Sequence, residues 1–308
     1  MGRPLRHHPA GQTYLVTTRS HQARFFLRPD RVLNKAVLEW LARAQQRYPR
    51  LRILAVCVMS NHLHLVVRDD DADLANWASY FFGHLARAVN QIRGRTGSCF
   101  ERRYSAEPIL DDEALVDRLV YVVTNPVQAG LCSSADRWPG ILLVADQGQT
   151  LDLEVTWIDR DRDRAQRTRA KRRGQKSPAG PICKASLVVD PAVVAAAGIG
   201  GAELRAAITA REQELARDRR RTRSRLPTRK QLVTQDWHDA PRAPKRGPRP
   251  LCHASDPLVR QTYLADFLAF VASFRDACER VLQGEVGVTF PDWCYPPGGR
   301  LVRPPAAA

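Results

Sequence analysis

The sequence lacks the features typical of secreted and membrane proteins. Its 7 cysteines form no Cys-x-x-Cys pair and their number is odd, which argues against a disulfide framework or a structural zinc site and for a reducing cytosol. Residues 1–15 contain no apolar core segment, so we expect no signal peptide. No uninterrupted apolar run approaches the ~20 residues of a membrane span, and the most apolar candidate, 185–210, is broken by Asp190 and Pro191. We therefore expect a cytoplasmic protein with no membrane partner.

Positive charge, in contrast, is present in excess. The 308 residues carry a formal net charge of +16, and the hydrophobic fraction of 44% is sufficient for a globular core. Residues 1–150 hold 19 Lys and Arg against 14 Asp and Glu, a net of +5, whereas later residues hold 29 against 18, a net of +11. This surplus favours a polyanionic partner, nucleic acid before membrane. An ordinary basic surface that only keeps the protein in solution is the alternative.

The hydrophobic pattern of the first half predicts alternating strands and helices. Strands are expected at 12–19, 51–59, 62–68 and 101–110, and helices at 28–49, at 74–97 and from Asp111 or Asp112 to about Pro126. The order β-α-β-β-α-β-α begins with a ferredoxin-like βαββαβ arrangement, an antiparallel sheet with helices on one face. We therefore predict an α+β fold in which an added helix carries Tyr121.

The second half has a different composition. Two arginine-rich runs, 159–176 and 211–230, precede the proline-rich basic linker 241–250, and a final helix is expected at 258–282 before an aromatic and proline-rich tail. We divide the chain into residues 1–146, residues 147–250 as a basic, partly helical and linker-rich extension, and residues 251–308 as a C-terminal helix with its tail. The region after residue 146 is thus predicted to be mainly helical and basic.

Two histidines, His62 and His64, lie one residue apart in an apolar run. On a strand this spacing places both imidazoles on one face of the sheet. Two such imidazoles can bind one divalent metal ion. The alternative is a pair of structural histidines, and the spacing alone leaves both interpretations open.

Tyr121 and Asn125 are four residues apart on the third predicted helix. They therefore share a helix face, with a hydroxyl and an amide carbonyl one turn apart. Without further context, a half-buried tyrosine beside a helix-stopping Asn-Pro pair explains the same residues.

Taken together, these motifs resemble a known family. The stretches "NHLHLVV", "YVVTNPVQAGL" and "RWPG" follow one another in the order found in HUH single-tyrosine transposases, and within them in the REP-associated tyrosine transposases. The matching positions are His62, Leu63, His64, Tyr121, Asn125, Pro126, Val127, Trp138 and Pro139. The resemblance covers roughly residues 10–146. Val123 and Thr124 depart from the family's usual residues, which bears on local packing more than on chemistry.

The resemblance implies a fold, a reaction and a site. Residues 1–146 would form an HUH transposase-like catalytic domain that cleaves and rejoins hairpin-flanked, single-stranded DNA through a 5′-phosphotyrosine. Tyr121 would be the nucleophile. His62, His64 and Asn125 would ligate Mg²⁺ or Mn²⁺, which suit an open site of mixed nitrogen and oxygen ligands.

Arg102 and Arg103 are the residues expected to bind nucleic acid. They lie beside Phe100 and Tyr104, and interleaved basic and aromatic side chains suit phosphate contact and base stacking on a single strand or hairpin tip. An exposed edge strand with ordinary charges explains them equally well. The arginine-rich runs either bind hairpin DNA or form solvated helix faces.

Two rival functions are considered. The first is a domesticated, sequence-specific DNA-binding protein that keeps the fold without cleavage, although His62, His64 and Tyr121 are all present. The second is an RNA-binding ferredoxin-like module, which would need exposed aromatic residues on the sheet that "NHLHLVV" does not offer. The sequence leaves monomer and homodimer open, and also whether the tyrosine attacks in cis or from a partner subunit.

Overall fold

The strands form one mostly antiparallel sheet. The computed structural model describes residues 5–144, 150–177, 179–241 and 250–305. Its seven-stranded sheet has the order β4-β1-β3-β2-β7-β6, and β5 pairs with β2 off this path. The strands are β1 (Gln12–Arg19), β2 (Leu51–Val58), β3 (His62–Asp69), β4 (Ser105–Ile109), β5 (Leu142–Val144), β6 (Leu151–Ile158) and β7 (Ile182–Val189). The β2–β7 contact is parallel and the other strand pairs are antiparallel. The predicted α+β class is confirmed.

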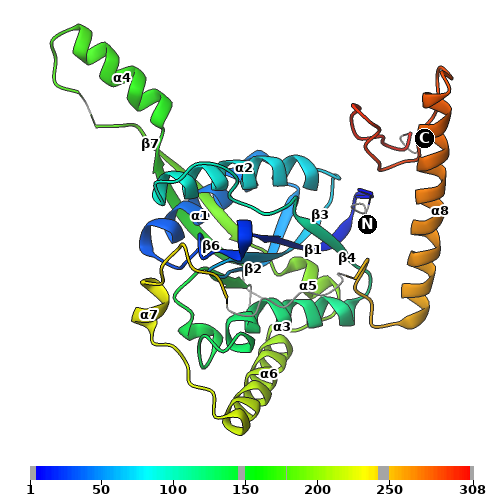
Figure 1. The fold of residues 1–308 in the computed structure, drawn as a ribbon, viewed down its shortest axis with the longest axis horizontal. Helices are drawn as coiled ribbons and strands as arrows, with labels where there is room; N and C mark the ends of the chain where they lie inside the picture. The colour runs from blue at the N-terminus through cyan, green and yellow to red at the C-terminus, as the bar shows by residue number, and fades with distance from the viewer. Residues whose placement is uncertain (1–4, 145–149, 178, 242–249, 306–308) are drawn as a thin grey trace.

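Helices cover both faces of this sheet (Figure 1). One face packs against α1 (Arg31–Arg47) and α2 (Leu74–Ile92), and its core includes Tyr14 and Val16 of β1. The other face packs against α3 (Asp112–Gln128), which in turn contacts α6 (Gly201–Thr222). The remaining helices are α4 (Arg160–Arg172), α5 (Ala192–Ala196), α7 (Arg229–Val233) and α8 (Pro257–Leu282), with 3₁₀ turns η1 (His21–Ala23) and η2 (Ala135–Arg137). Alternate residues of β1 and β3 therefore face two different helical layers.

The third helix is longer than predicted. Its N-cap is Asp111, whose side chain accepts a hydrogen bond from the backbone N–H of Ala114 at 2.7 Å. The expected end at Pro126 is wrong, because the helix continues to Gln128. Proline removes one backbone donor, but the carbonyls of the last turn are still satisfied: the N–H groups of Ala129 and Leu131 donate to Asn125 and Pro126. Asn125 is therefore held inside a regular helix.

The fourth strand is shorter than predicted. β4 begins at Ser105, and residues 101–104 precede it without strand structure. Pro108 lies in this strand, and β4 occupies the edge of the sheet next to β1, as expected for a strand that contains proline. Arg102 and Arg103 therefore lie in the segment that leads into the strand.

The basic extension adds two strands that were not predicted. β6 and β7 pair along their whole lengths, and Val189 at the end of β7 pairs with Ile53 of β2. Between them, α4 projects beyond the sheet as a basic arm (Figure 1). The division of the chain at residues 146 and 250 stays a prediction. Most of the expected linker, residues 242–249, lies outside the described residues.

The C-terminal helix is joined to the N-terminal half of the chain at its first turn. The second carboxylate oxygen of Asp111 accepts hydrogen bonds from the backbone N–H groups of Ser255 and Asp256, at 2.7 and 3.2 Å. His253 pairs with the outer edge of β4, where its N–H donates to Pro108 and its carbonyl accepts from Leu110. One aspartate thus caps α3 and also holds the start of α8.

Candidate active site

The two histidines lie on the sheet face that α3 covers. In β3, His64 is opposite Thr17 of β1 and Cys57 of β2, so strands flank it on both sides. The ring centroids of His62 and His64 are 4.9 Å apart and the rings are nearly perpendicular, at 86°. The i, i+2 spacing therefore brings both imidazoles together on one face of the sheet.

Each histidine has a hydrogen-bond partner at Nδ1. Nδ1 of His64 lies 3.0 Å from the Thr17 hydroxyl oxygen, and Nδ1 of His62 lies 2.6 Å from the Asn61 side-chain oxygen. Metal-binding histidines characteristically use one ring nitrogen for such a contact, which fixes the tautomer and the ring orientation. The arrangement makes Nε2 of each ring the nitrogen that would bind a metal ion.

Tyr121 and Asn125 face this pair from α3. The Tyr121 ring centroid lies 5.3 Å from that of His64, at 80°, and the Tyr121 and Asn125 side chains are hydrogen-bonded. Burial raises the pKa of the Tyr121 hydroxyl, and the Arg118 guanidinium, 5.3 Å from the ring centroid, acts in the opposite direction. The helix and the strand thus bring together all four residues predicted for catalysis and metal binding.

The donor set fits a hard divalent cation better than zinc. Two imidazoles and the amide oxygen of the buried Asn125 would give mixed nitrogen and oxygen ligation, with positions left for water and phosphate. Among the described residues, no group of three or more His, Cys, Asp or Glu side chains is placed to hold a metal ion. A site at His62 and His64 therefore depends on Asn125 or on the substrate for further ligands.

A buried carboxylate near the tyrosine was missed by the sequence analysis. Glu107 of β4 shares the sheet face of His64, and its negative charge raises the pKa of Tyr121 further. Its oxygens lie 2.7 Å from the Ser105 hydroxyl oxygen and 3.0 Å from Nε2 of His253. A glutamate that alternates with a serine in an edge strand looks like a solvated residue, so its burial could not be read from the sequence.

The segment after α3 packs on the strand that precedes the histidines. Trp138 donates its indole N–H to the carbonyl of Val58 at 3.1 Å. A Cβ at Gly140 would lie 2.9 Å from that same carbonyl oxygen and still closer to the Trp138 ring, so this close approach requires glycine. The "RWPG" motif therefore fixes the end of β2 next to the turn that carries Asn61.

Arg102 and Arg103 do not join the histidine and tyrosine cluster. Both are exposed, and they line a hollow on the α2 side of the sheet together with Phe100 and Tyr104. The predicted neighbourhood of basic and aromatic side chains is present there. It lies on the opposite face of the sheet from Tyr121.

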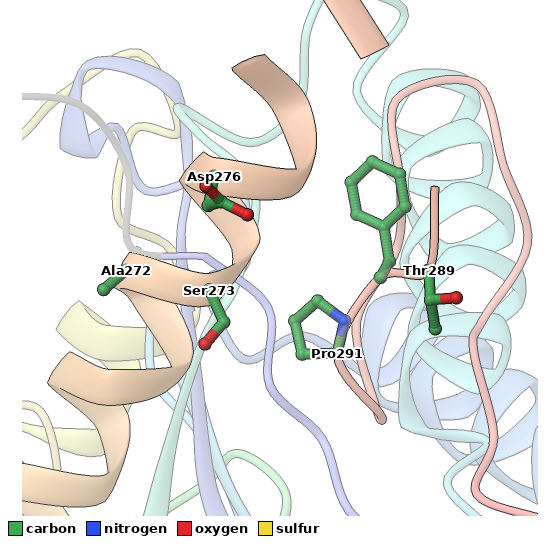
Figure 2. A pocket seen from close by; sticks show the side chains of 6 residues that line it. Ala272, Ser273, Asp276, Thr289 and Pro291 are labelled. Carbon is green, nitrogen blue, oxygen red and sulfur yellow. The ribbon is translucent and has the colours of Figure 1, made fainter. Parts of the chain in front are cut away.

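Another hollow shares no lining residue with the one that Arg102 and Arg103 line. It has a volume of about 560 Å³ and opens between α8 and the tail (Figure 2). Ala272, Ser273 and Asp276 line it from the helix, and Thr289 and Pro291 line it from the tail. Asp276 is its one titratable lining residue among those described, so this hollow offers little chemistry.

Comparison with known proteins agrees with the motif analysis. No protein-family profile matches the chain. A protein of Haemophilus influenzae (strain ATCC 51907 / DSM 11121 / KW20 / Rd) named "Putative REP-associated tyrosine transposase" is 26% identical in an alignment of 105 positions that covers 30% of this chain and 59% of that protein. This chain resembles the REP-associated tyrosine transposases. The resemblance expected from the motifs is confirmed, and the match spans less than two thirds of the relative's length.

A solved structure of a REP-associated tyrosine transposase bound to a REP hairpin also matches. It is 18% identical, with a TM-score of 0.37, over 46% of this chain and 81% of that chain.

None of the helices within the described residues is both long enough and apolar enough to cross a bilayer.

Proposed function

We propose that this protein is a metal-dependent transposase or nickase that cleaves and rejoins single-stranded DNA beside a hairpin. The observation that carries the proposal is the contact between the Tyr121 ring on α3 and the His64 ring on β3. Tyr121 lies one helical turn before Asn125, to which its side chain is hydrogen-bonded. A potential nucleophile thus lies against a potential metal ligand. The resemblance to the REP-associated tyrosine transposases supports the same reaction class.

In the proposed reaction, the Tyr121 hydroxyl oxygen attacks the phosphorus of a DNA phosphodiester. A tyrosyl P–O bond forms, the bond from phosphorus to the 3′ oxygen breaks, the tyrosine proton passes to solvent, and the departing oxygen takes up a proton from water. The products are a 5′-phosphotyrosine and a 3′-OH, and attack by a 3′-OH on the phosphotyrosine rejoins the strand. Each half reaction conserves the phosphodiester, so the cycle needs no external energy source.

The residues around Tyr121 have separate roles in this proposal. His62, His64 and Asn125 would hold Mg²⁺ or Mn²⁺, which when bound would neutralise charge on the phosphoryl oxygens. Thr17 and Asn61 orient the two imidazoles through their Nδ1 contacts. Because burial keeps the Tyr121 hydroxyl protonated near neutral pH, its activation depends on positive charge brought close to the oxygen.

The basic extension would hold the DNA duplex of the hairpin. The exposed arginines of α4 and the arginines of the last turn of α6 supply positive charge outside the catalytic cluster. Ion pairs with Asp159 and Asp163 engage two of the α4 arginines, Arg162 and Arg167, and leave others available for phosphate. The partner proposed is therefore hairpin DNA with adjacent unpaired nucleotides.

The proposal is tested by trapping the covalent product. A hairpin oligonucleotide with unpaired flanks, labelled at its 3′ end, is incubated with the full chain and Mn²⁺ and then run on a denaturing gel. We expect labelled protein that disappears when EDTA is added before the DNA. Hairpin binding without any adduct, across a panel of flanking sequences, would favour the non-cleaving DNA-binding protein instead.

A further inference from the structure

A second site opens at the same end of the sheet, on the face turned towards α2. It is a hollow of about 250 Å³, below the roughly 300–1,000 Å³ of sites that enclose drug-sized ligands. Phe82, Phe100 and Tyr104 line it, and the Phe82 ring centroid lies 5.7 Å from the centroids of each of the other two rings. The volume and the aromatic lining suit one planar ring.

Small residues of α2, the helix that also carries Phe82, form another part of the lining. Ala75, Ala78, Ser79 and Gly83 line the hollow from this helix. A Cβ added at Gly83 would meet no atom within 4 Å, so the space beside this residue is open. These small side chains leave the hollow open beside Gly83.

The charged lining of the hollow is positive. Arg6, Arg102 and Arg103 line it, and no Asp or Glu is found among the described residues that do so. Arg102 and Arg103 are exposed at the mouth, where they can contact a phosphate without being desolvated. A ligand that combines a flat ring with an anionic group matches this composition.

Two donors at the wall lack acceptors. Among the described residues, neither the Tyr104 hydroxyl nor Nε of Arg6 has a hydrogen-bond partner, and both atoms are buried. Burial raises the pKa of Tyr104 to about 12, so its hydroxyl remains a donor at neutral pH. Both atoms are shielded from the hollow, so a ligand there would be held by the aromatic rings and by Arg102 and Arg103.

Both ends of the described chain help to build this wall. The guanidinium carbon of Arg6 lies 5.7 Å from the ring centroid of Tyr104 and also 5.7 Å from that of Tyr295 in the tail. The N–H of His8 donates to the carbonyl of Trp293 at 3.3 Å. The tail after α8 thereby holds the N-terminal segment that brings Arg6 to the hollow.

The hollow and the tyrosine cluster are adjacent in the fold. Thr18 lines the hollow, and the preceding residue, Thr17, contacts His64 on the opposite face of β1. A single strand that passes around this end of the sheet would meet both sites.

We propose that the hollow binds one unpaired nucleotide of the DNA substrate, with its base against Phe82 and Phe100 and its phosphate on Arg102 and Arg103. This inference rests on the proposed function, because it assumes that single-stranded DNA is the substrate. It gives the N-terminal segment and the C-terminal tail a part in substrate recognition.

The test uses the full chain and binding alone, measured by fluorescence anisotropy. The probes are a bare hairpin, the same hairpin with unpaired flanks, and a set in which each unpaired position in turn is abasic. Base–aromatic stacking predicts that one abasic position weakens wild-type binding by about five- to a hundredfold. A ribonucleotide version of the flanked hairpin distinguishes RNA from DNA.

Gly83→Leu fills the hollow and improves helix propensity, so the fold should be retained. We expect this variant to bind the bare hairpin like wild type and to lose the penalty at that one abasic position. Gln46→Leu, at an exposed position of α1, is the matched control and should keep the penalty. Should Gly83→Leu misfold by circular dichroism, Arg102→Ala provides the second variant, with an expected severalfold loss on the flanked hairpin alone.

The possible failures can be distinguished. A Gly83→Leu protein that still discriminates the abasic position as wild type does would overturn the nucleotide site and leave the proposed function intact. Tighter binding of the hairpin with ribonucleotide flanks than of the hairpin with DNA flanks would overturn the nucleotide site in favour of an RNA ligand. Absence of hairpin binding by wild type would contradict the proposed function together with this inference.

Discussion

Nε2 of His253 lies 3.0 Å from Oε2 of Glu107, so a buried contact joins residues that are 146 positions apart. The exposed fractions of the two side chains are 12% and 9%. With the Asp111 contacts to residues 255 and 256, this pair anchors the start of α8 to the edge of the sheet. The C-terminal helix is therefore attached beside β4, the strand that places Glu107 near Tyr121.

The first prediction concerns this anchor. His253→Ala removes one of the partners of a buried carboxylate and should lower the free energy of unfolding by about 1–3 kcal/mol. Urea denaturation measures the loss, and limited proteolysis should cut residues 250–256 earlier than in wild type. His238→Ala is the control, since His238 makes a similar contact with Asp236 in an exposed position and should change little. Equal proteolysis of both variants would contradict the anchoring role.

The second prediction concerns the orientation of His64. Thr17→Val keeps the shape of the side chain and removes the hydroxyl 3.0 Å from Nδ1 of His64. Removal of such a supporting hydrogen bond typically weakens metal binding by about 10- to 100-fold. We therefore expect the Mn²⁺ concentration for half-maximal cleavage to rise, with hairpin affinity unchanged. Thr13→Val, on the same strand, serves as the control. An unchanged Mn²⁺ dependence would argue against His64 as a ligand that uses Nε2.

The third prediction concerns acid stability. Burial, with the positive charges of Arg6 and Arg103, lowers the pKa of His8 to about 3, whereas an unfolded histidine titrates near 6.5. Between these values the unfolded chain takes up a proton that the folded chain does not, so stability is present above pH 6.5 and is lost as the pH falls. One such proton contributes about 1.4 kcal/mol per pH unit.

His8→Gln should therefore reduce the loss of stability between pH 6 and pH 4, as measured by urea denaturation at several pH values. His21→Gln is the control and should retain the wild-type slope. A His8→Gln protein with the wild-type slope would show that other groups dominate the acid response.

The fourth prediction concerns the basic arm. Arg164, Arg169 and Arg172 of α4 are exposed. Replacing all three by Gln should flatten the plot of log affinity for hairpin DNA against log salt concentration, by about 0.9 for each phosphate that the protein no longer neutralises. The double variant Arg260→Gln and Arg275→Gln on α8 is the control. A triple variant with the wild-type slope would place the DNA elsewhere on the molecule.

The local parts of the candidate site were predictable from the sequence, because each depends on short-range geometry. A strand places residues i and i+2 on one face, which fixes the relation of His62 to His64, and a helix does the same for Tyr121 and Asn125. The packing of α3 over β3 did not follow from the ferredoxin-like order of elements, which predicted helices on one face of the sheet, whereas α3 covers the other face. The order of strands and helices was recognisable in the sequence because apolar runs, such as the one around Val56, mark the strands.

Contacts between distant segments were not predictable. Nothing in the sequence near Glu107 indicates that His253 would bury it, and β7 joins the sheet through one residue pair, Ile53 with Val189. Charged and apolar residues alternate in β6, as in a strand, but the arginine-rich run that follows it favoured the prediction of a mainly helical, basic region. The segment of Arg102 and Arg103 was predicted as strand, but it passes instead to the α2 side of the sheet.

The most direct measurement for the central claim is the formation of the covalent adduct by Tyr121→Phe. The substitution keeps the ring against His64 and removes only the hydroxyl, so the protein should fold and bind hairpin DNA normally. With Mn²⁺ and substrates labelled at the 5′ or 3′ end, wild type and the control Tyr80→Phe should retain the 3′ label on a denaturing gel, because the link is to a 5′ phosphate. Tyr121→Phe should retain neither label. An adduct that persists in Tyr121→Phe would contradict the assignment of Tyr121 as the nucleophile.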